Sequence, residues 1–402
     1  MTPVNHTIAP FEFAPAPHLR FGWGIRKQLA AHLTQSYPGK KVIISSTTLA
    51  KEGNFSAELL QQLDPQETQI FTLSGEPSPD LVDDIVQQCA PNTAAVIGIG
   101  GGSALDAAKA VAGLIPSQHS VMNYLEGVGK GMKFAVDTCP FIAVPTTAGT
   151  GSETTKNAVL SKIGHFKKSF RDNKLLAKEA WLDPELLQSC PKEVLYATGM
   201  DAFTQLLESY TTIKANPMTD ALAWQGMQYF IGAFEKINSA DSARQQEGYG
   251  NLMLAASFSG MTLANAGLGA VHGLAGPIGA FFDAPHGIVC ARLLAPITEQ
   301  NLIALAQATQ PIQQQVLIKY QQVSVLLNNG KEFANIEQNR QFLVAHLQKM
   351  AQTYAPSGLK AYGLTATNIA PVLANCRSGS MLGNAIELSD AALNAALITA
   401  ID

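Results

Sequence analysis

Charged and aromatic residues are scarce in this sequence, at 14% and 7% of its 402 residues. A typical soluble domain is about one quarter charged, so the low value indicates much buried surface and favours an oligomer. Lys and Arg together number 27 and do not exceed the 31 Asp and Glu. Without a basic excess to neutralise phosphates, nucleic-acid binding is not expected. The 47% hydrophobic content excludes an intrinsically disordered chain.

Paired cysteines and an export signal are also lacking. The five cysteines lie far apart, with no Cys-x-x-Cys pair. An odd, scattered set argues against a disulfide framework and fits a reducing compartment. Residues 1–20 carry prolines and polar residues where a signal peptide needs a continuous apolar stretch. We therefore expect a cytoplasmic protein.

One segment approaches the composition of a membrane span. Residues Gly248–Phe282 contain no Asp, Glu, Lys or Arg, but they are rich in Gly, Asn, Ser and His, and Pro277 interrupts them. A spanning helix and a buried helical hairpin beside a site both fit this composition. We favour the hairpin and expect no membrane partner.

The chain changes character near residue 190, and its length is too great for one compact core. Before that point short apolar runs alternate with amphipathic segments, which is typical of a parallel sheet covered by helices. The expected strands are 40–46, 68–73, 94–101 and 140–147, and the expected helices between them include 57–63 and 79–89. After residue 190, helical spacing dominates, as in 218–237, 244–264 and 342–351. The sequence thus predicts an α/β domain over 1–190 and an all-helical domain over 191–402, with a linker around 181–191.

The first chemical motif follows an expected strand and opens an expected helix, and it reads GIGGGSALDAAK over residues 98–109. Glycines at 100–102 let a ligand approach the backbone closely, because no Cβ intervenes. A helix that starts near Ser103 presents free N–H groups that suit a pyrophosphate. Strand-to-helix turns also use glycines without any ligand, and the spacing is not the GxGxxG of a dinucleotide fold.

The second motif reads VPTTAGTGSETT over residues 144–155 and also leaves a strand. Its glycines and hydroxyl groups suit sugar and ring contacts, whereas the alternative is a turn that caps the next helix through Ser152. Both motifs follow strands, so they are expected at the carboxyl edge of one sheet, where open α/β folds bind ligands.

A third group of residues lies in the helical half. Asp201 and Gln205 are four residues apart and share one helix face. His272 and His286 follow in a glycine-rich, charge-free region. One carboxylate, two imidazoles and an amide oxygen form a candidate site for a divalent transition metal. Each histidine taken alone is also consistent with a hydrogen-bonded core residue.

These motifs, in this order, resemble those of the iron-containing (group III) alcohol dehydrogenases. The resemblance is carried by GGGSALDAAK, PTTAGTGSETT, DAFTQLLESY and VHGLAGPIGAFFDAPHG, and it covers about residues 20–300. It implies an N-terminal dinucleotide-binding α/β domain, a C-terminal helical domain and a cleft between them. It also implies interconversion of an alcohol with an aldehyde or ketone, with NAD or NADP as cofactor, and a homodimer.

The resemblance further implies residue roles. The expected ligands of the metal, Fe²⁺ or Zn²⁺, are Asp201, Gln205, His272 and His286. The metal would stabilise the negative charge on the substrate oxygen. Asp201, His272 and His286 are therefore also the expected catalytic residues. The expected cofactor contacts are Ser46, Gly101, Gly102, Ser103, Asp106, Thr146, Thr147, Thr150, Ser152 and Lys168. Lys168 has lysine neighbours, so a surface role is a strong alternative for it.

Three positions depart from the family pattern. The second metal ligand is normally His, and Gln205 occupies its place; an amide oxygen is the poorer donor, so weaker or altered metal binding is expected. Gly276 stands where many members have a second histidine, which removes a candidate proton relay. Ser46 stands where an NAD-preferring member has Asp, which removes the repulsion of a 2′-phosphate, so we expect NADP to be tolerated.

Some residues and functions have competing interpretations. Glu208 fits either a support role behind the metal or a helix surface, and Cys290 is interpreted as a small buried apolar residue rather than a nucleophile. Asp106 and Lys109 are one turn apart and can pair with each other. Phe281 or Phe282 is a candidate for the pocket wall. The rival functions are a metal-independent reductase of the same superfamily, similar to maleylacetate reductases, a cyclising synthase of the dehydroquinate synthase kind, and a nucleotide-binding protein without activity.

Overall fold

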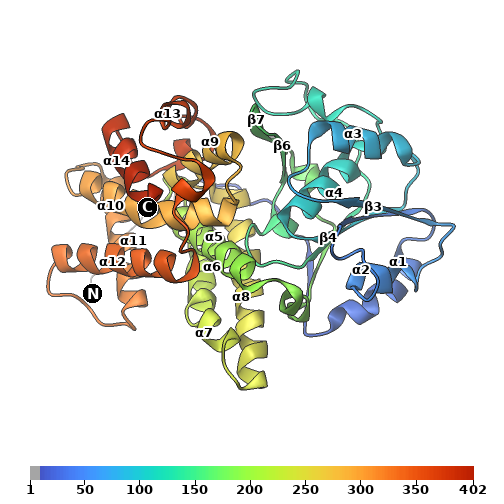
Figure 1. The fold of residues 1–402 in the computed structure, drawn as a ribbon, viewed down its shortest axis with the longest axis horizontal. Coiled ribbons are helices and arrows are strands. Elements are labelled where there is room, and N and C mark those ends of the chain that lie inside the picture. Colours follow the sequence, from blue (N-terminus) through green and yellow to red (C-terminus); the bar gives the residue numbers. More distant parts are fainter. Residues whose placement is uncertain (1–9) are drawn as a thin grey trace.

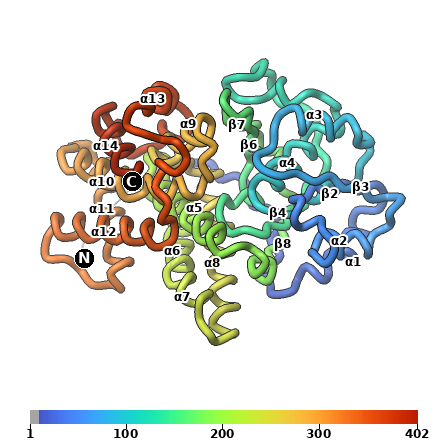
Figure 2. The backbone as a smooth tube through the Cα atoms, viewed as in Figure 1, coloured from blue at the N-terminus to red at the C-terminus, as the bar shows by residue number. Residues whose placement is uncertain are grey.

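The computed structural model describes residues 10–402 and consists of an α/β half followed by a helical half (Figure 1). The N-terminal half, blue to green, lies on one side of the molecule, and the C-terminal half, yellow to red, lies on the other (Figure 2). The α/β half ends with a strand at Leu182 and the first long helix begins at Lys192. The expected change from mixed to helical structure near residue 190 falls in this interval.

A six-stranded sheet with the order β1-β8-β5-β4-β2-β3 forms the centre of the α/β half, and all its neighbouring strands are parallel. A separate antiparallel hairpin, β6-β7, projects from it. The strands are β1 His18–Phe21, β2 Lys41–Ser46, β3 Thr68–Leu73, β4 Ala95–Gly100, β5 Phe141–Pro145, β6 Asn157–Lys162, β7 Phe166–Arg171 and β8 Glu179–Leu182.

The four strands expected from apolar runs are β2 to β5. Every residue of β4 and of β5 is buried, as expected for strands that helices cover on both faces. The strands β1 and β8 and the hairpin were not expected, because they are short or carry charged residues. The 181–191 segment is not a free linker: Trp181 is buried in β8, and a 3₁₀ helix at Pro184–Ser189 packs behind it.

The α/β half contains helices that connect successive strands, and the helical half forms a bundle around α5. The helices are α1 Leu29–Ser36, α2 Phe55–Leu60, α3 Pro79–Gln88, α4 Gly102–Leu114, α5 Lys192–Thr211, α6 Pro217–Phe230, α7 Ala233–Ile237, α8 Ser242–Ala266, α9 Ala270–Phe282, α10 His286–Leu305, α11 Pro311–Leu327, α12 Ile336–Tyr354, α13 Ala370–Asn375 and α14 Asp390–Ile401. The single helix expected over 218–237 is broken into α6 and α7 at Gly232, whose φ of 75° is the left-handed conformation that glycine adopts readily.

The charge-free segment 248–282 forms most of α8 and all of α9, which meet at an angle of 101°. The two helices therefore meet near a right angle and do not form the antiparallel hairpin that was expected, although α9 does line the cavity described below. Helix α10 is also long and apolar enough to cross a membrane, but 67% of its most apolar window is buried inside the protein. Core helices of soluble proteins have this composition and this burial.

Candidate active site and metal centre

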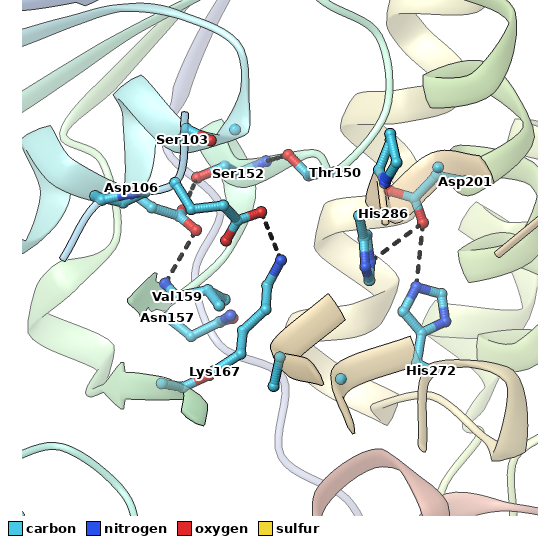
Figure 3. A pocket seen from close by; sticks show the side chains of 18 of the residues that line it. Ser103, Asp106, Thr150, Ser152, Asn157, Val159, Lys167, Asp201, His272 and His286 are labelled. Atoms are coloured by element: carbon cyan, nitrogen blue, oxygen red, sulfur yellow. Dashed lines mark hydrogen bonds and ion pairs between the residues drawn. The ribbon is translucent and has the colours of Figure 1, made fainter. Parts of the chain in front are cut away.

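A cavity of about 1130 Å³ lies between the two halves. Its wall on the sheet side is formed by loops that follow β2, β3, β4 and β5, and its opposite wall by α5, α9 and the start of α10. Figure 3 shows Asp106 and Ser152 on one side and Asp201, His272 and His286 on the other. The volume slightly exceeds the usual range for one drug-sized ligand, which is about 300–1,000 Å³, as expected for a site that holds a large cofactor and a substrate.

The glycine loop lies at the carboxyl end of β4, and β4 pairs directly with β5, which leads into the second motif. The two loops pack closely. A Cβ on Gly101 would lie 3.2 Å from the Thr147 side chain, and one on Gly102 would lie 2.9 Å from that of Thr150. These glycines therefore allow the two loops to meet, while the free N–H groups at the start of α4 face the cavity.

The second motif is fixed by a buried ion pair. Lys109 is fully buried on α4, and its Nζ donates to Ser152 Oγ at 3.0 Å and to Thr155 Oγ1 at 2.9 Å. Its Nζ lies 3.6 Å from Asp106 Oδ1, so these two residues do pair. Asp106 in turn accepts hydrogen bonds from Ser152 Oγ and from the Val159 backbone N–H. Both carboxylate oxygens of Asp106 are thus engaged within the protein, which makes it a link between the motifs.

Nearly all the expected cofactor residues line this cavity. They are Ser46, Gly101, Gly102, Ser103, Asp106, Thr147, Thr150, Ser152 and Lys168. Thr146 is the exception, because it is 6% exposed and its backbone N–H donates to Gly100 O, which ties β4 to β5. The alternative role for Ser152 as a helix cap is wrong: Gly151 precedes a 3₁₀ turn over Ser152–Thr154, and Ser152 lies inside it.

Two adjacent lysines of β7 point to opposite faces of the hairpin, as strand geometry requires. Lys168 lies beside Gly127 at the cavity edge. Lys167 extends between the two halves (Figure 3) and donates to Glu76 Oε1 at 2.6 Å. Ser161, the cross-strand partner of Lys167, donates to the other Glu76 oxygen at 3.0 Å. Both lysines line the cavity, so the expected cofactor contact of Lys168 stays a prediction, and Lys167 is engaged by Glu76.

The carboxylate and the two imidazoles expected at the metal do meet, although they come from α5, α9 and α10. Asp201 Oδ1 lies 3.1 Å from His272 Nε2 and 3.8 Å from His286 Nε2. Asp201 is almost completely buried. Three donor atoms of the types that Fe²⁺ and Zn²⁺ accept thus converge on one point in the cavity wall.

Glu208 decides which nitrogen of His272 faces this point. Its Oε2 accepts a hydrogen bond from His272 Nδ1 at 2.7 Å, and its Oε1 accepts one from the Val271 N–H at 2.7 Å. Glu208 holds the proton on Nδ1, while Nε2 donates to Asp201 Oδ1 at 3.1 Å and would become a ligand by losing its own proton when a metal binds. This carboxylate–histidine arrangement is common behind metal ligands. Of the two roles considered for Glu208, the helix-surface role does not hold, since the residue is 6% exposed and its carboxylate holds His272.

Gln205 contacts the cluster but does not present its oxygen to it. Its Nε2 lies 3.4 Å from Asp201 Oδ2, and its Oε1 lies 3.1 Å from Ser259 Oγ. An oxygen ligand would have to point toward Asp201 Oδ1 and the imidazoles. The expected ligand role of Gln205 is therefore not met in this arrangement, because the amide holds the carboxylate instead.

The charges in this cluster are those of a cation site. Burial opposes ionisation of Asp201, but the imidazoles of His286 and His272 outweigh it and lower the pKa of that carboxyl to about 2. Burial, together with the nearby Lys167 charge, lowers the pKa of His286 to about 4. At neutral pH Asp201 is thus a carboxylate and His286 a neutral imidazole, which are the forms that bind metal. Burial opposes a charge on His272, but Cys290, Asp201 and Glu208 outweigh it and raise the pKa of His272 well above its ordinary value, so metal binding would have to displace a proton from this ring.

Comparison with known proteins agrees with this geometry. Residues 16–184 match the family model described as iron-containing alcohol dehydrogenase, and residues 195–387 match the C-terminal model of the same family. The chain belongs to the iron-containing alcohol dehydrogenase family. The resemblance inferred from the motifs is confirmed, and so is its activity class: the chain is a nicotinamide-linked alcohol dehydrogenase.

Several curated relatives are about one third identical to the chain over the regions that align. Alcohol dehydrogenase 4 of Schizosaccharomyces pombe is 32% identical over 70% of this chain and 66% of its own length. Alcohol dehydrogenase 4 of Saccharomyces cerevisiae is 30% identical over 70% and 73%, respectively. NAD-dependent methanol dehydrogenase of Bacillus methanolicus is 32% identical over 70% and 74%.

Solved structures support the fold. A 1,3-propanediol oxidoreductase has a TM-score of 0.83 at 24% identity and covers 98% of this chain and 100% of its own. An alcohol dehydrogenase from Oenococcus oeni has a TM-score of 0.84 at 23% identity, with coverage of 97% and 100%. The predicted α/β plus all-helical architecture is therefore confirmed.

Proposed function

We propose that the metal of this dehydrogenase is held by Asp201, His272 and His286, and that the dinucleotide lies along the glycine loop. The observation that carries the proposal is the convergence of one carboxylate and two imidazoles opposite that loop, across a single cavity. Asp201 and Glu208 also flank His272, and two buried carboxylates around one imidazole call for further positive charge. The residues present therefore fit a divalent cation.

Each wall has its own task in hydride transfer. The N–H groups at the start of α4, with the hydroxyls of Thr147 and Thr150, would bind and orient the cofactor phosphates and sugar. In alcohol oxidation, hydride would pass from the alcohol carbon to the nicotinamide and the hydroxyl proton would leave to solvent; reduction would reverse both. A metal held by Asp201, His272 and His286 would stabilise negative charge on the substrate oxygen. Placing both sites in one cleft supplies the proximity that the transfer requires.

We propose that a small alcohol or aldehyde is the substrate and that NADP is accepted alongside NAD. Ser46 ends β2 and lines the cavity, so no carboxylate at this position repels a 2′-phosphate. Phe281 lines the same cavity from α9, whereas Phe282 packs against the helical core. We expect kcat/KM with NADPH to lie within about tenfold of that with NADH, which corresponds to about 1.4 kcal/mol. A Ser46→Asp variant is expected to lose NADPH turnover selectively.

The deciding experiment measures NADH and NADPH oxidation with a panel of short aldehydes before and after metal removal. We expect chelation to abolish turnover and Fe²⁺ or Zn²⁺ to restore it. Asp201→Asn should bind metal poorly and should not be restored. Undiminished turnover of the metal-free protein would instead establish the rival metal-independent reductase. No turnover with any metal would favour the nucleotide-binding protein without activity.

We further propose a cytoplasmic homodimer. All five cysteines are free thiols, which supports a reducing compartment. Strand β1 is at the edge of the sheet, and Phe21 on it is 46% exposed, which supports a partner on this side. Light scattering of the purified protein during size-exclusion chromatography would test the dimer. Fractionation of cells that express the chain would test the location.

A further inference from the structure

Cys290 lies within the metal centre. Its Sγ lies 3.6 Å from Nε2 of His272 and 3.6 Å from Nε2 of His286. The side chain is completely buried. One donor atom from each of Asp201, His272, His286 and Cys290 falls within 4.8 Å of all the others. Four donors therefore enclose one small space, which is the spacing that a single ion requires.

The start of α10 explains why the thiol reaches this space. His286 is the first residue of the helix and Cys290 is four residues later, so both side chains project from the same face. The same spacing on α5 places Gln205 beneath Asp201. The difference lies in what each side chain does: the Gln205 amide hydrogen-bonds Asp201 and Ser259, while the Cys290 sulfur is directed at the two imidazoles.

A thiolate is compatible with the charges of the ion's direct ligands. Asp201 and two neutral imidazoles would leave a divalent ion at about +1, and a thiolate would bring the ion and its direct ligands to about zero. The Glu208 carboxylate behind His272 adds one more negative charge to the buried cluster, so the assignment rests on the position of the sulfur and not on the charge sum. Cysteine binds as the thiolate, and metal binding would release its proton to solvent.

We propose that Cys290 is the fourth protein ligand of the resident divalent ion, in the place where the family pattern has the histidine that Gln205 replaces. This inference rests on the metal site proposed above. Gln205 then acts as a positioning residue, holding Asp201 Oδ2 while Oδ1 faces the ion. Because thiolates favour Zn²⁺ over harder ions, the ligand set Asp-His-His-Cys shifts the preference of this chain from iron toward zinc.

X-ray absorption at the zinc edge tests the ligand directly and does not depend on turnover. In zinc-loaded wild-type protein we expect one sulfur scatterer at about 2.3 Å among nitrogen and oxygen scatterers at about 2.0–2.2 Å. A cobalt-loaded sample should show a thiolate-to-cobalt charge-transfer band in the near ultraviolet. Both signals should vanish in Cys290→Ser. Its zinc affinity should fall by more than about 100-fold, since loss of an outer-shell partner alone typically costs 10–100-fold.

Cys376→Ser is the matched control, because Cys376 is also completely buried in the helical half but contacts the Leu373 carbonyl instead of the cluster. It should retain both signals. Wild-type protein that binds one zinc without a sulfur scatterer would overturn the thiolate ligand while leaving the proposed metal-dependent function intact. Wild-type protein that binds no metal would overturn both. The wild-type spectrum decides the question even if Cys290→Ser does not fold.

Discussion

Replacement of Glu208 by Gln gives a sharp test of how the metal centre is organised. The variant keeps the size of the side chain and an oxygen that can accept from the Val271 N–H, a bond of 2.7 Å in the wild type. What it loses is the carboxylate that accepts from His272 Nδ1, also at 2.7 Å. An amide nitrogen turned toward Nδ1 would instead donate to it. The imidazole proton would then move to Nε2, the nitrogen that faces Asp201.

The magnitude follows from this change of tautomer. Loss of a partner behind a ligating histidine typically weakens metal affinity by 10–100-fold, which is about 1.4–2.7 kcal/mol. Because Glu208 is 6% exposed, little solvent is available to replace its charge, so we expect the upper part of that range. Substrate does not contact Glu208 in the proposed site, so kcat at saturating metal should fall more than KM rises.

The assay is competition for Zn²⁺ against a chromophoric chelator, followed by kcat and KM at saturating metal. Glu332→Gln is the control, since Glu332 is exposed between α11 and α12 and does not line the cavity. Thermal unfolding of the metal-free variants would detect any loss of fold. Metal affinity of Glu208→Gln within threefold of the wild type would refute the reasoning.

Three further predictions address other parts of the molecule. Gly102→Ala places a Cβ 2.9 Å from the Thr150 side chain, so we expect weaker NADH binding and a loss of about 1–3 kcal/mol in stability, measured by fluorescence titration and denaturant unfolding. Gly276→His enters open space, since beyond its own chain neighbours no atom of residues 10–402 lies within 4 Å of where its Cβ would be, so it should fold normally and change the pH profile of kcat. Burial opposes the charge of Glu179, but hydrogen bonds from His32, Tyr37 and Arg20 outweigh it and lower its pKa to about 2. Glu179→Gln should therefore lower Tm at pH 7 but not near pH 2.

The sign of the Glu179 effect follows from linkage. The folded-state pKa lies below the ordinary value of 4.5, so the stabilisation is fully present above pH 4.5 and is lost as pH falls toward 2. An equal Tm difference at both pH values would contradict this assignment. For the glycines, unchanged NADH affinity in Gly102→Ala, or an unfolded Gly276→His protein, would contradict the packing described.

Local sequence patterns were sufficient to predict much of the fold. Apolar runs identified β2, β4 and β5, which are buried on both faces, and also the edge strand β3, which is only partly buried. Helical spacing identified long helices of the second half. The edge strand β1 was not found, since it has only four residues, HLRF, and none of them is buried. The β6-β7 hairpin carries lysines on both faces and gives no hydrophobic period either.

The site was found in outline because its motifs are contiguous. Asp201, His272 and His286 could be selected as residue types, and the family resemblance gave them roles. The residues that support these three side chains could not be distinguished from surface residues by the same reasoning. Glu208 lies two helical turns from Asp201, and the spacing alone fits a surface residue as well as one that contacts His272. The signal that would have indicated Cys290 was its four-residue spacing from His286 on one helix face.

The sequence by itself determined the class of fold, the two loops at the sheet edge and the kinds of donor atoms available for a metal. Only the tertiary structure decided which of them meet: Cys290 rather than Gln205 directs its donor atom at the imidazoles, and Lys167 pairs with Glu76 at the cavity. The physical reason is the distance along the chain over which each kind of signal acts. Periodicity and turn chemistry act over a few residues, whereas the distances among these side chains are set by how α5, α9, α10 and the β6-β7 hairpin pack together.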